Sequence, residues 1–242
     1  MPALDARLER DLAGFTDDVA DALGDALVNL TVYGSAAGED WVPGRSDVNA
    51  VIVVRAVSAT LLDVLAQVVP RWRRHGFALP LVVDEEFLDR ARDAFAMEFD
   101  DIRRAHRTLH GPDLFAAVTV DRAHLRRQCE HEARARLLRL RALYLDAAGH
   151  AHEVERLLVS SAVTFLVILR HVLHLRGDET PHAFADVLAA GERLLGPLPA
   201  LRRVLDHRRS GGRLLRGQLA AEFGRYLADA ERIVAAVDTV PA

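Results

Sequence analysis

The fold is decided by two stretches, Thr31-Val32-Tyr33-Gly34-Ser35 and, after eleven further residues, Asp47-Val48-Asn49-Ala50-Val51. Both belong to runs of β-branched and other apolar residues, 28–32 and 48–54, which predict two strands. The first strand leads into a Gly-Ser turn, where glycine removes a side chain and leaves backbone N–H groups accessible. Such a turn lets a phosphate approach the backbone, so the stretch predicts an anion-binding turn beside a sheet.

Asp47 and Asn49 lie two residues apart at the start of the second predicted strand. Because side chains alternate along a strand, both point to one face, while the residues between and after them point to the core. Mg²⁺ prefers hard oxygen ligands and usually shares them with phosphates. Two oxygen-bearing side chains beside a phosphate-binding turn therefore predict a site for Mg²⁺ and a triphosphate.

Such a site normally needs a third acid from a neighbouring strand, and Glu98 is the candidate. The alternating aromatic residues around it predict a strand over 95–99 in which Glu98 points away from the aromatic face. We expect Glu98 to lie beside Asp47, with Asp100 as a further acid, and a helix to continue as far as residue 110.

Taken together, Tyr33-Gly34-Ser35 and Ser46-Asp47-Val48-Asn49 resemble the Gly-Ser and Asp-x-Asp signature of the DNA polymerase β-like nucleotidyltransferase superfamily. Its small members with a helical C-terminal region include aminoglycoside and minimal nucleotidyltransferases. The resemblance covers residues 28–54 well and 95–111 more loosely. It implies a mixed sheet flanked by helices, Mg²⁺, and transfer of a nucleotidyl group from a nucleoside triphosphate to a hydroxyl of a small molecule or protein.

The resemblance also implies roles for individual residues. The metal and catalytic positions are Asp47, Asn49 and Glu98, and the nucleotide-binding positions are Gly34, Ser35 and Ser46. One position departs from the family, because its second aspartate corresponds to Asn49, which is neutral and cannot act as a base. A second function therefore stays open: a catalytically silent protein that acts as a nucleotide-binding or protein-interaction module.

The two halves of the chain differ in pattern. The first half alternates helical and strand patterns and predicts an α/β domain over 1–118. It includes a helix over 4–27, a helix that begins after Ser58, a strand over 79–83 and a helix capped by Asp84. The second half, 119–242, predicts an all-α bundle. Its expected helices are Asp121–Ala148, Glu153–Arg176, Pro181–Leu195 and Arg213–Val237.

The composition excludes several classes of protein. The chain has 242 residues, of which 50% are hydrophobic and 27% charged, so a disordered or disulfide-stapled chain is excluded. A net charge of −4 gives no overall attraction to nucleic acid or to an anionic membrane. The single cysteine and the charged N-terminus predict a cytoplasmic protein. The longest apolar run, 157–169, predicts a buried helix rather than a membrane span.

Three further patterns have simpler interpretations. His106 and His110 have a zinc-compatible spacing in the predicted helix, but no third ligand is evident, so we interpret them as a pocket wall. The arginine series between 122 and 141 is interleaved with acids and predicts an ion-paired solvated face. Arg202 and His207 have the spacing found in HEPN ribonucleases, and we interpret it as chance, with metal-independent RNA cleavage as the weaker alternative.

Overall fold

The computed structural model describes residues 6–38, 41, 46–178, 180–181, 183–210, 214 and 219–240. The chain divides into two units, Met1–Val120 and Asp121–Ala242. The first unit contains a mixed four-stranded sheet, and the second unit is helical in all of its described elements.

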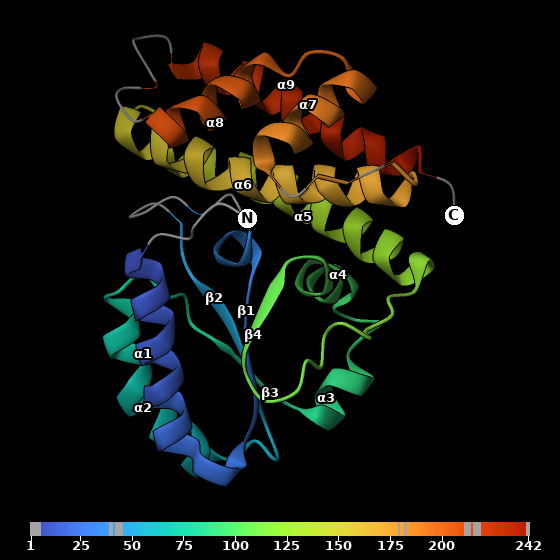
Figure 1. The fold of residues 1–242 in the computed structure, drawn as a ribbon. Coiled ribbons are helices and arrows are strands. Elements are labelled where there is room, and N and C mark those ends of the chain that lie inside the picture. The colour runs from blue at the N-terminus through green and yellow to red at the C-terminus, as the bar shows by residue number, and fades with distance from the viewer. Residues whose placement is uncertain are drawn as a thin grey trace. The chain divides into compact units, whose positions relative to one another are not determined.

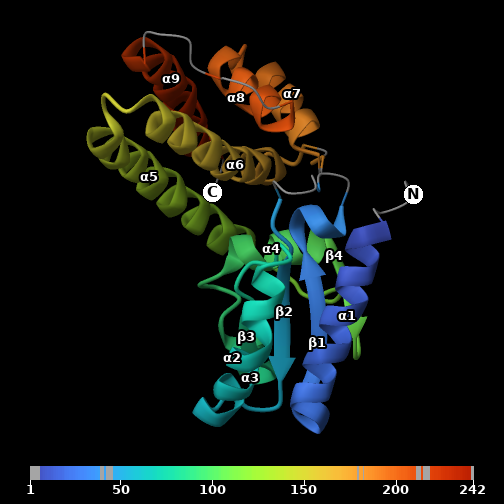
Figure 2. The ribbon, with the colours of Figure 1, turned by 90° about the vertical axis from the view of Figure 1, so that its left-hand side faces the viewer.

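The strand order in the sheet is β3-β2-β1-β4. The strands are β1 (Leu27–Tyr33), β2 (Asn49–Val54), β3 (Leu81–Asp84) and β4 (His106–His110). β1 is antiparallel to both β2 and β4, whereas β2 and β3 are parallel (Figure 2). The two strands predicted from 28–32 and 48–54 are therefore neighbours at the centre of the sheet, which confirms the predicted α/β class.

Helices cover both faces of the sheet (Figure 1). α1 (Ala6–Leu23) and α2 (Ala59–Arg73) lie on one face, while α3 (Glu85–Arg90) and α4 (Ala96–Arg104) lie on the other. The caps of α2 and α3 agree with the sequence, since Ser58 Oγ accepts from the Leu61 N–H and Asp84 Oδ1 accepts from the Phe87 N–H. Each face has its own apolar cluster, which includes Phe15 on one face and Phe115 on the other.

The segment 95–110 corrects two predictions. Residues 96–104 form helix α4 instead of a strand, and residues 106–110 form strand β4 instead of a helix. The buried residues of α4 recur at helical spacing and pack on the sheet, whereas Phe95 is exposed. β4 pairs with the otherwise unpaired edge of β1. The alternation of aromatic residues in 95–99 was misleading. Which segment becomes a strand is decided by backbone pairing with β1, which is far away in the sequence.

The helical unit contains α5 (Arg122–Ala147), α6 (Ala151–Leu175), α7 (Phe184–Leu195), α8 (Pro199–Ser210) and α9 (Leu219–Asp238). α6 lies against each of the other four helices (Figure 2). The sequence patterns did not predict α8, whose backbone N–H groups at Ala200 and Leu201 donate to the buried Asp229 of α9. This cap is supplied from another helix, since Leu198 before the helix has no capping side chain, and Pro199 at the first helical position was the local signal for α8.

Among the described helices, α6 has the length and composition that would allow it to cross a membrane. More than half of its most apolar stretch is buried within the structure. Its position against four other helices is that of a core helix, as the apolar run 157–169 predicted.

Candidate functional site

The two halves of the sequence motif meet at one end of the sheet. Tyr33, the last residue of β1, pairs directly with Asn49, the first residue of β2. A Cβ atom added to Gly34 would lie 3.4 Å from Asn49 Nδ2, so the Asn49 side chain lies beside the turn. Gly34 has a φ of 74°, a left-handed conformation that favours glycine.

The Gly-Ser turn differs from the expected phosphate cradle in one respect. The Gly34 N–H donates to the Ala105 carbonyl at 3.0 Å, so it is occupied by the backbone that precedes β4. Ser35 lies in a short 3-10 turn, Gly34–Ala37, and its half-buried hydroxyl has no hydrogen bond to the described residues. The Ser35 hydroxyl in this turn is therefore available to a ligand.

Asp47 is held at this end of the sheet by its neighbour Val48. The Val48 N–H donates to the Gly76 carbonyl at 2.9 Å, and its carbonyl accepts from the Ala78 N–H at 3.0 Å. The Val48 side chain is buried in the core, so the Asp47 side chain points the other way and is exposed. Within the described part of the chain, no ion pair involves Asp47, while Ser46 next to it is buried.

Glu98 comes to this region from α4 rather than from a strand. It is exposed in the first turn of that helix, and Asp101 lies one turn further along. Burial, together with the negative charges of Glu98 and Asp101, raises the pKa of the Tyr33 phenol to about 12. Both acids therefore lie near the hydroxyl of a residue paired with Asn49.

Asp100 does not lie free for a metal. It is buried, and its two oxygens accept from Arg103 Nη2 at 2.9 Å and from Arg104 Nε at 2.8 Å. Neutralisation by two arginines explains how a carboxylate can be buried in this helix. Asp100 is therefore held in ion pairs within α4 instead of assisting the metal site.

The oxygen donors at this end of the sheet do not form a preformed metal centre. They are better suited to a metal ion that binds together with its substrate. No group of three or more His, Cys, Asp or Glu residues that could hold a metal ion is found among the described residues. On β3, the residues on the face of Asn49 are the apolar Leu81 and Val83. One exposed carboxylate, Asp47, and one amide oxygen, Asn49, match Mg²⁺, which keeps several waters and shares phosphate oxygens.

The site contains a histidine–aspartate pair that the sequence analysis missed. His106 pairs with Tyr33 across β1 and β4, and its Nε2 lies 3.0 Å from Asp113 Oδ1. Burial raises the pKa of Asp113, but hydrogen bonds from His106 and from the Ala116 and Phe115 N–H groups outweigh it and hold this pKa below its ordinary value. His106 and His110 lie on a strand instead of the predicted helix. The position of Asp113 after a Gly-Pro turn was the available sequence signal.

Most residues of the remaining sequence patterns, the arginine series and the Arg202–His207 spacing, form ion pairs. On α5 the paired arginines are Arg126, Arg134, Arg136 and Arg141, which confirms the ion-paired face. Arg202 Nε donates to Glu192 at 3.2 Å, and His207 Nε2 lies 3.1 Å from Glu155. These pairs connect α8 to α7 and to α6, which supports a structural role for the Arg202–His207 spacing.

The mixed sheet and the helical second unit have a fold that is also found in a nucleotidyltransferase of known structure. The chain is similar to spectinomycin adenyltransferase AAD(9) from Enterococcus faecialis, whose crystal structure contains ATP and spectinomycin. The TM-score is 0.61 at 12% sequence identity, over 95% of this chain and 99% of that chain. No protein-family model and no curated protein matches the chain. The likeness confirms the predicted fold, an α/β nucleotidyltransferase-like unit followed by a helical unit.

Proposed function

We propose that the chain is an Mg²⁺-dependent nucleotidyltransferase that moves a nucleotidyl group from a nucleoside triphosphate to a hydroxyl of a small molecule. The observation that carries the proposal is the juxtaposition of the Gly34 turn with Asn49, next to Asp47, at one end of the sheet. The ATP in the similar adenyltransferase supports a nucleotide substrate. Its spectinomycin supports a small molecule as the acceptor.

The residues proposed to bind Mg²⁺ and the nucleotide form two groups. Asp47 and Asn49 are the proposed ligands of Mg²⁺, which when bound neutralises phosphate charge and favours in-line attack at the α-phosphate. Gly34, Ser35 and Ser46 are the proposed nucleotide-binding residues. The Ser35 hydroxyl donates to a phosphate oxygen, and Gly34 allows the turn its left-handed backbone conformation beside Asn49.

In the proposed reaction the acceptor oxygen forms a bond to the α-phosphorus. The bond from that phosphorus to the bridging oxygen breaks, and pyrophosphate leaves with the electron pair. The acceptor hydroxyl releases a proton, which we assign to Glu98 because it is an exposed carboxylate near Tyr33. Asn49 cannot accept this proton, since an amide is neutral.

The likeness to an enzyme gives no support to the alternative of a catalytically silent module. The two functions differ in the fate of the bound nucleotide. A transferase releases pyrophosphate when an acceptor is added, whereas a silent module binds the nucleotide and leaves it intact.

The first test is calorimetric binding of ATP, GTP, CTP and UTP with Mg²⁺ to the wild type and to Asp47→Ala. We expect one or more of these triphosphates to bind only with Mg²⁺, and we expect Asp47→Ala to lose at least tenfold in affinity. Asp63→Ala is the matched control, because Asp63 is also exposed but lies on α2. It should bind as the wild type does.

Pyrophosphate release then tests the transfer step. Spectinomycin is the first acceptor to add, with each triphosphate that binds. The proposal would be overturned by a wild type that binds no triphosphate with Mg²⁺, or by binding that Asp47→Ala leaves unchanged. Binding without release across a panel of hydroxyl-bearing acceptors would instead favour the silent module.

A further inference from the structure

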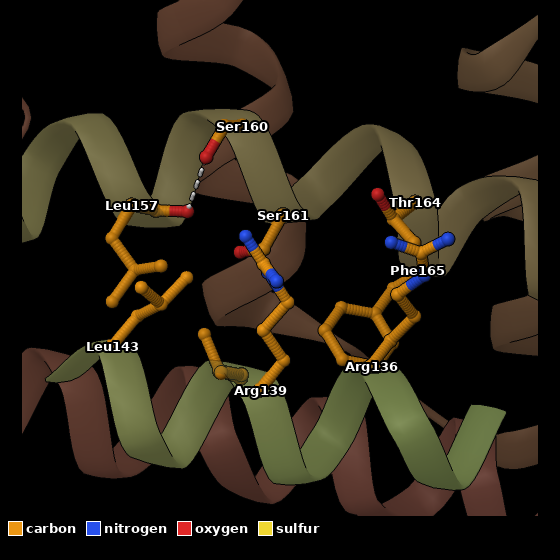
Figure 3. Close-up of a pocket in the computed structure, with 9 residues that line it drawn as sticks. Arg136, Arg139, Leu143, Leu157, Ser160, Ser161, Thr164 and Phe165 are labelled. Carbon is orange, nitrogen blue, oxygen red and sulfur yellow. Dashed lines mark hydrogen bonds between the residues drawn. The ribbon is translucent and has the colours of Figure 1, made fainter. Parts of the chain in front are cut away.

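A groove between α5 and α6 of the helical unit has a lining that nucleotidyl transfer at the sheet does not require (Figure 3). Its cavity volume is about 250 Å³. The floor is apolar and buried, formed by Leu140, Leu157 and Phe165. The rim is polar, with arginines from α5 facing hydroxyl side chains from α6 (Figure 3).

The two arginines, Arg136 and Arg139, lie three residues apart on α5 and extend toward α6 (Figure 3). Arg136 donates to Glu132 through Nε at 2.9 Å, and its Nη2 lies 2.8 Å from the same carboxylate oxygen, so its Nη1 is the nitrogen left for a second anion. Arg139 has no acidic partner in the described part of the chain. An anion on this rim would therefore meet the uncompensated charge of Arg139 beside the remaining nitrogen of Arg136.

Helical neighbours explain why Arg139 differs from the arginines of α5 that pair with an acid along the helix. Arg126 and Arg134 both pair with Glu130, four residues away along the helix. The positions three and four residues from Arg139 are instead Ala135, Arg136, Ala142 and Leu143. No local acid can therefore neutralise this guanidinium, and it is placed over the groove (Figure 3).

Across the groove, α6 supplies hydroxyl groups in fixed positions. Ser161 Oγ lies 2.9 Å from the hydroxyl of the buried Tyr226, which anchors this side of the groove. Thr164 is half-buried, and its hydroxyl has no hydrogen bond within the described residues. It is therefore available to donate to a ligand oxygen.

We propose that this groove binds a small organic phosphate, with the phosphate between Arg136, Arg139 and Thr164 and an apolar body against the floor. Guanidinium groups suit phosphate because their planar forks donate two parallel hydrogen bonds. The apolar floor favours a ligand with a hydrocarbon body over a bare ion. This site belongs to the helical unit alone and stands independently of nucleotidyl transfer.

Phenyl phosphate is a suitable probe, measured by calorimetry in buffer with EDTA and without Mg²⁺. We expect it to bind the full-length wild type more tightly than inorganic phosphate or phenol does. Arg139→Gln should lose at least tenfold in affinity, and Thr164→Val about threefold. Both variants replace exposed or half-buried groups, and circular dichroism checks that their helix content matches the wild type.

Arg122→Gln is the control, because Arg122 is an exposed residue of α5 outside the groove. It should bind phenyl phosphate as the wild type does. The proposal would fail if the wild type did not bind the probe, or if Arg139→Gln and Arg122→Gln bound it equally. Asp47→Ala separates the two sites, since it should lose triphosphate binding with Mg²⁺ and keep phenyl phosphate binding without it.

Discussion

Asn49 is the residue at which this chain departs from the motif it resembles. It begins β2 beside Tyr33 and the Gly34 turn, where its side chain supplies an oxygen but no charge. A carboxylate at this position would attract Mg²⁺ more strongly than an amide does.

We expect Asn49→Asp to bind a triphosphate with Mg²⁺ roughly tenfold more tightly, which corresponds to about 1.4 kcal/mol. If the wild type is a slow enzyme, pyrophosphate release should rise as well. Calorimetry and a release assay measure the two effects, and Asn49→Ala should show neither gain. An unchanged affinity in Asn49→Asp would mean that Asn49 does not face the metal.

Gly111 shows how one residue fixes the position of a strand. It comes directly after β4 with a φ of 77°, and a Cβ atom there would lie 2.0 Å from the Val28 carbonyl oxygen. An alanine would therefore have to displace the backbone of β1 in addition to adopting a strained conformation.

We expect Gly111→Ala to lower the free energy of unfolding by about 3 kcal/mol or more, measured by urea denaturation. Gly76→Ala is the matched control. Gly76 also has a positive φ, but a Cβ atom there would meet nothing within 4 Å. It should therefore show only the backbone strain of about 1–2 kcal/mol. Equal losses in the two variants would contradict the proposed clash with Val28.

At the scale of elements, α8 depends on a cap from another helix. Asp229 of α9 is buried, and its Oδ2 accepts from the Ala200 N–H at 2.8 Å and from the Leu201 N–H at 3.0 Å. These contacts satisfy two of the N–H groups that the start of a helix leaves without partners. The same carboxylate therefore stabilises α8 and ties it to α9.

We expect Asp229→Ala to destabilise the protein by about 2 kcal/mol, because two buried N–H groups lose their acceptor. Chemical denaturation measures the loss, and hydrogen exchange should show faster exchange at the start of α8. Asp238→Ala is the control on α9, since Asp238 is exposed and pairs with Arg134. Its effect should stay within roughly 1 kcal/mol. A similar loss in both variants would show that the buried cap contributes little.

Elements also show what local sequence can and cannot predict. β1, β2 and the capped starts of α2 and α3 were predicted because their signals lie within a few residues. The strand and the helix predicted within 95–110 are the reverse of the observed α4 and β4. The segment fits both the strand and the helix periodicity, and pairing with β1 decides between them. At the site, Gly34, Asp47 and Asn49 were predicted from the motif, whereas the contact of Asp113 with His106 depends on the position of β4.

At the scale of the whole molecule, ion pairs in both units make stability depend on pH. Hydrogen bonds from Arg107 hold the pKa of Glu9 below its ordinary value, and hydrogen bonds from Arg202 do the same for Glu192. The folded state therefore binds fewer protons at these groups than the unfolded state. Their contribution is fully present above the ordinary pKa of a glutamate, roughly 4.3, and is lost as the pH falls through the lowered values.

We expect the Tm to fall as the pH is lowered below roughly 4.3, and Glu9→Gln to weaken this dependence in the N-terminal unit. The effect of Glu9→Gln at neutral pH should be small, because the pair is partly exposed and screened by water. Scanning calorimetry between pH 3 and 7 measures both. Asp17→Asn, an exposed residue of the same helix, is the control. A pH dependence identical in the two variants would contradict the role of Glu9.

The sequence by itself determined the two central strands, the glycine turn between them and the predominance of helices in the second half. These features arise from periodicity, chain stiffness and the missing side chain of glycine, which act over a few residues. Only the tertiary structure decided that Glu98 lies on a helix, that Asp100 is neutralised, and that Arg139 faces hydroxyls across a groove. Those outcomes depend on contacts between segments far apart in the chain, and a local pattern carries no information about the partner that will be present.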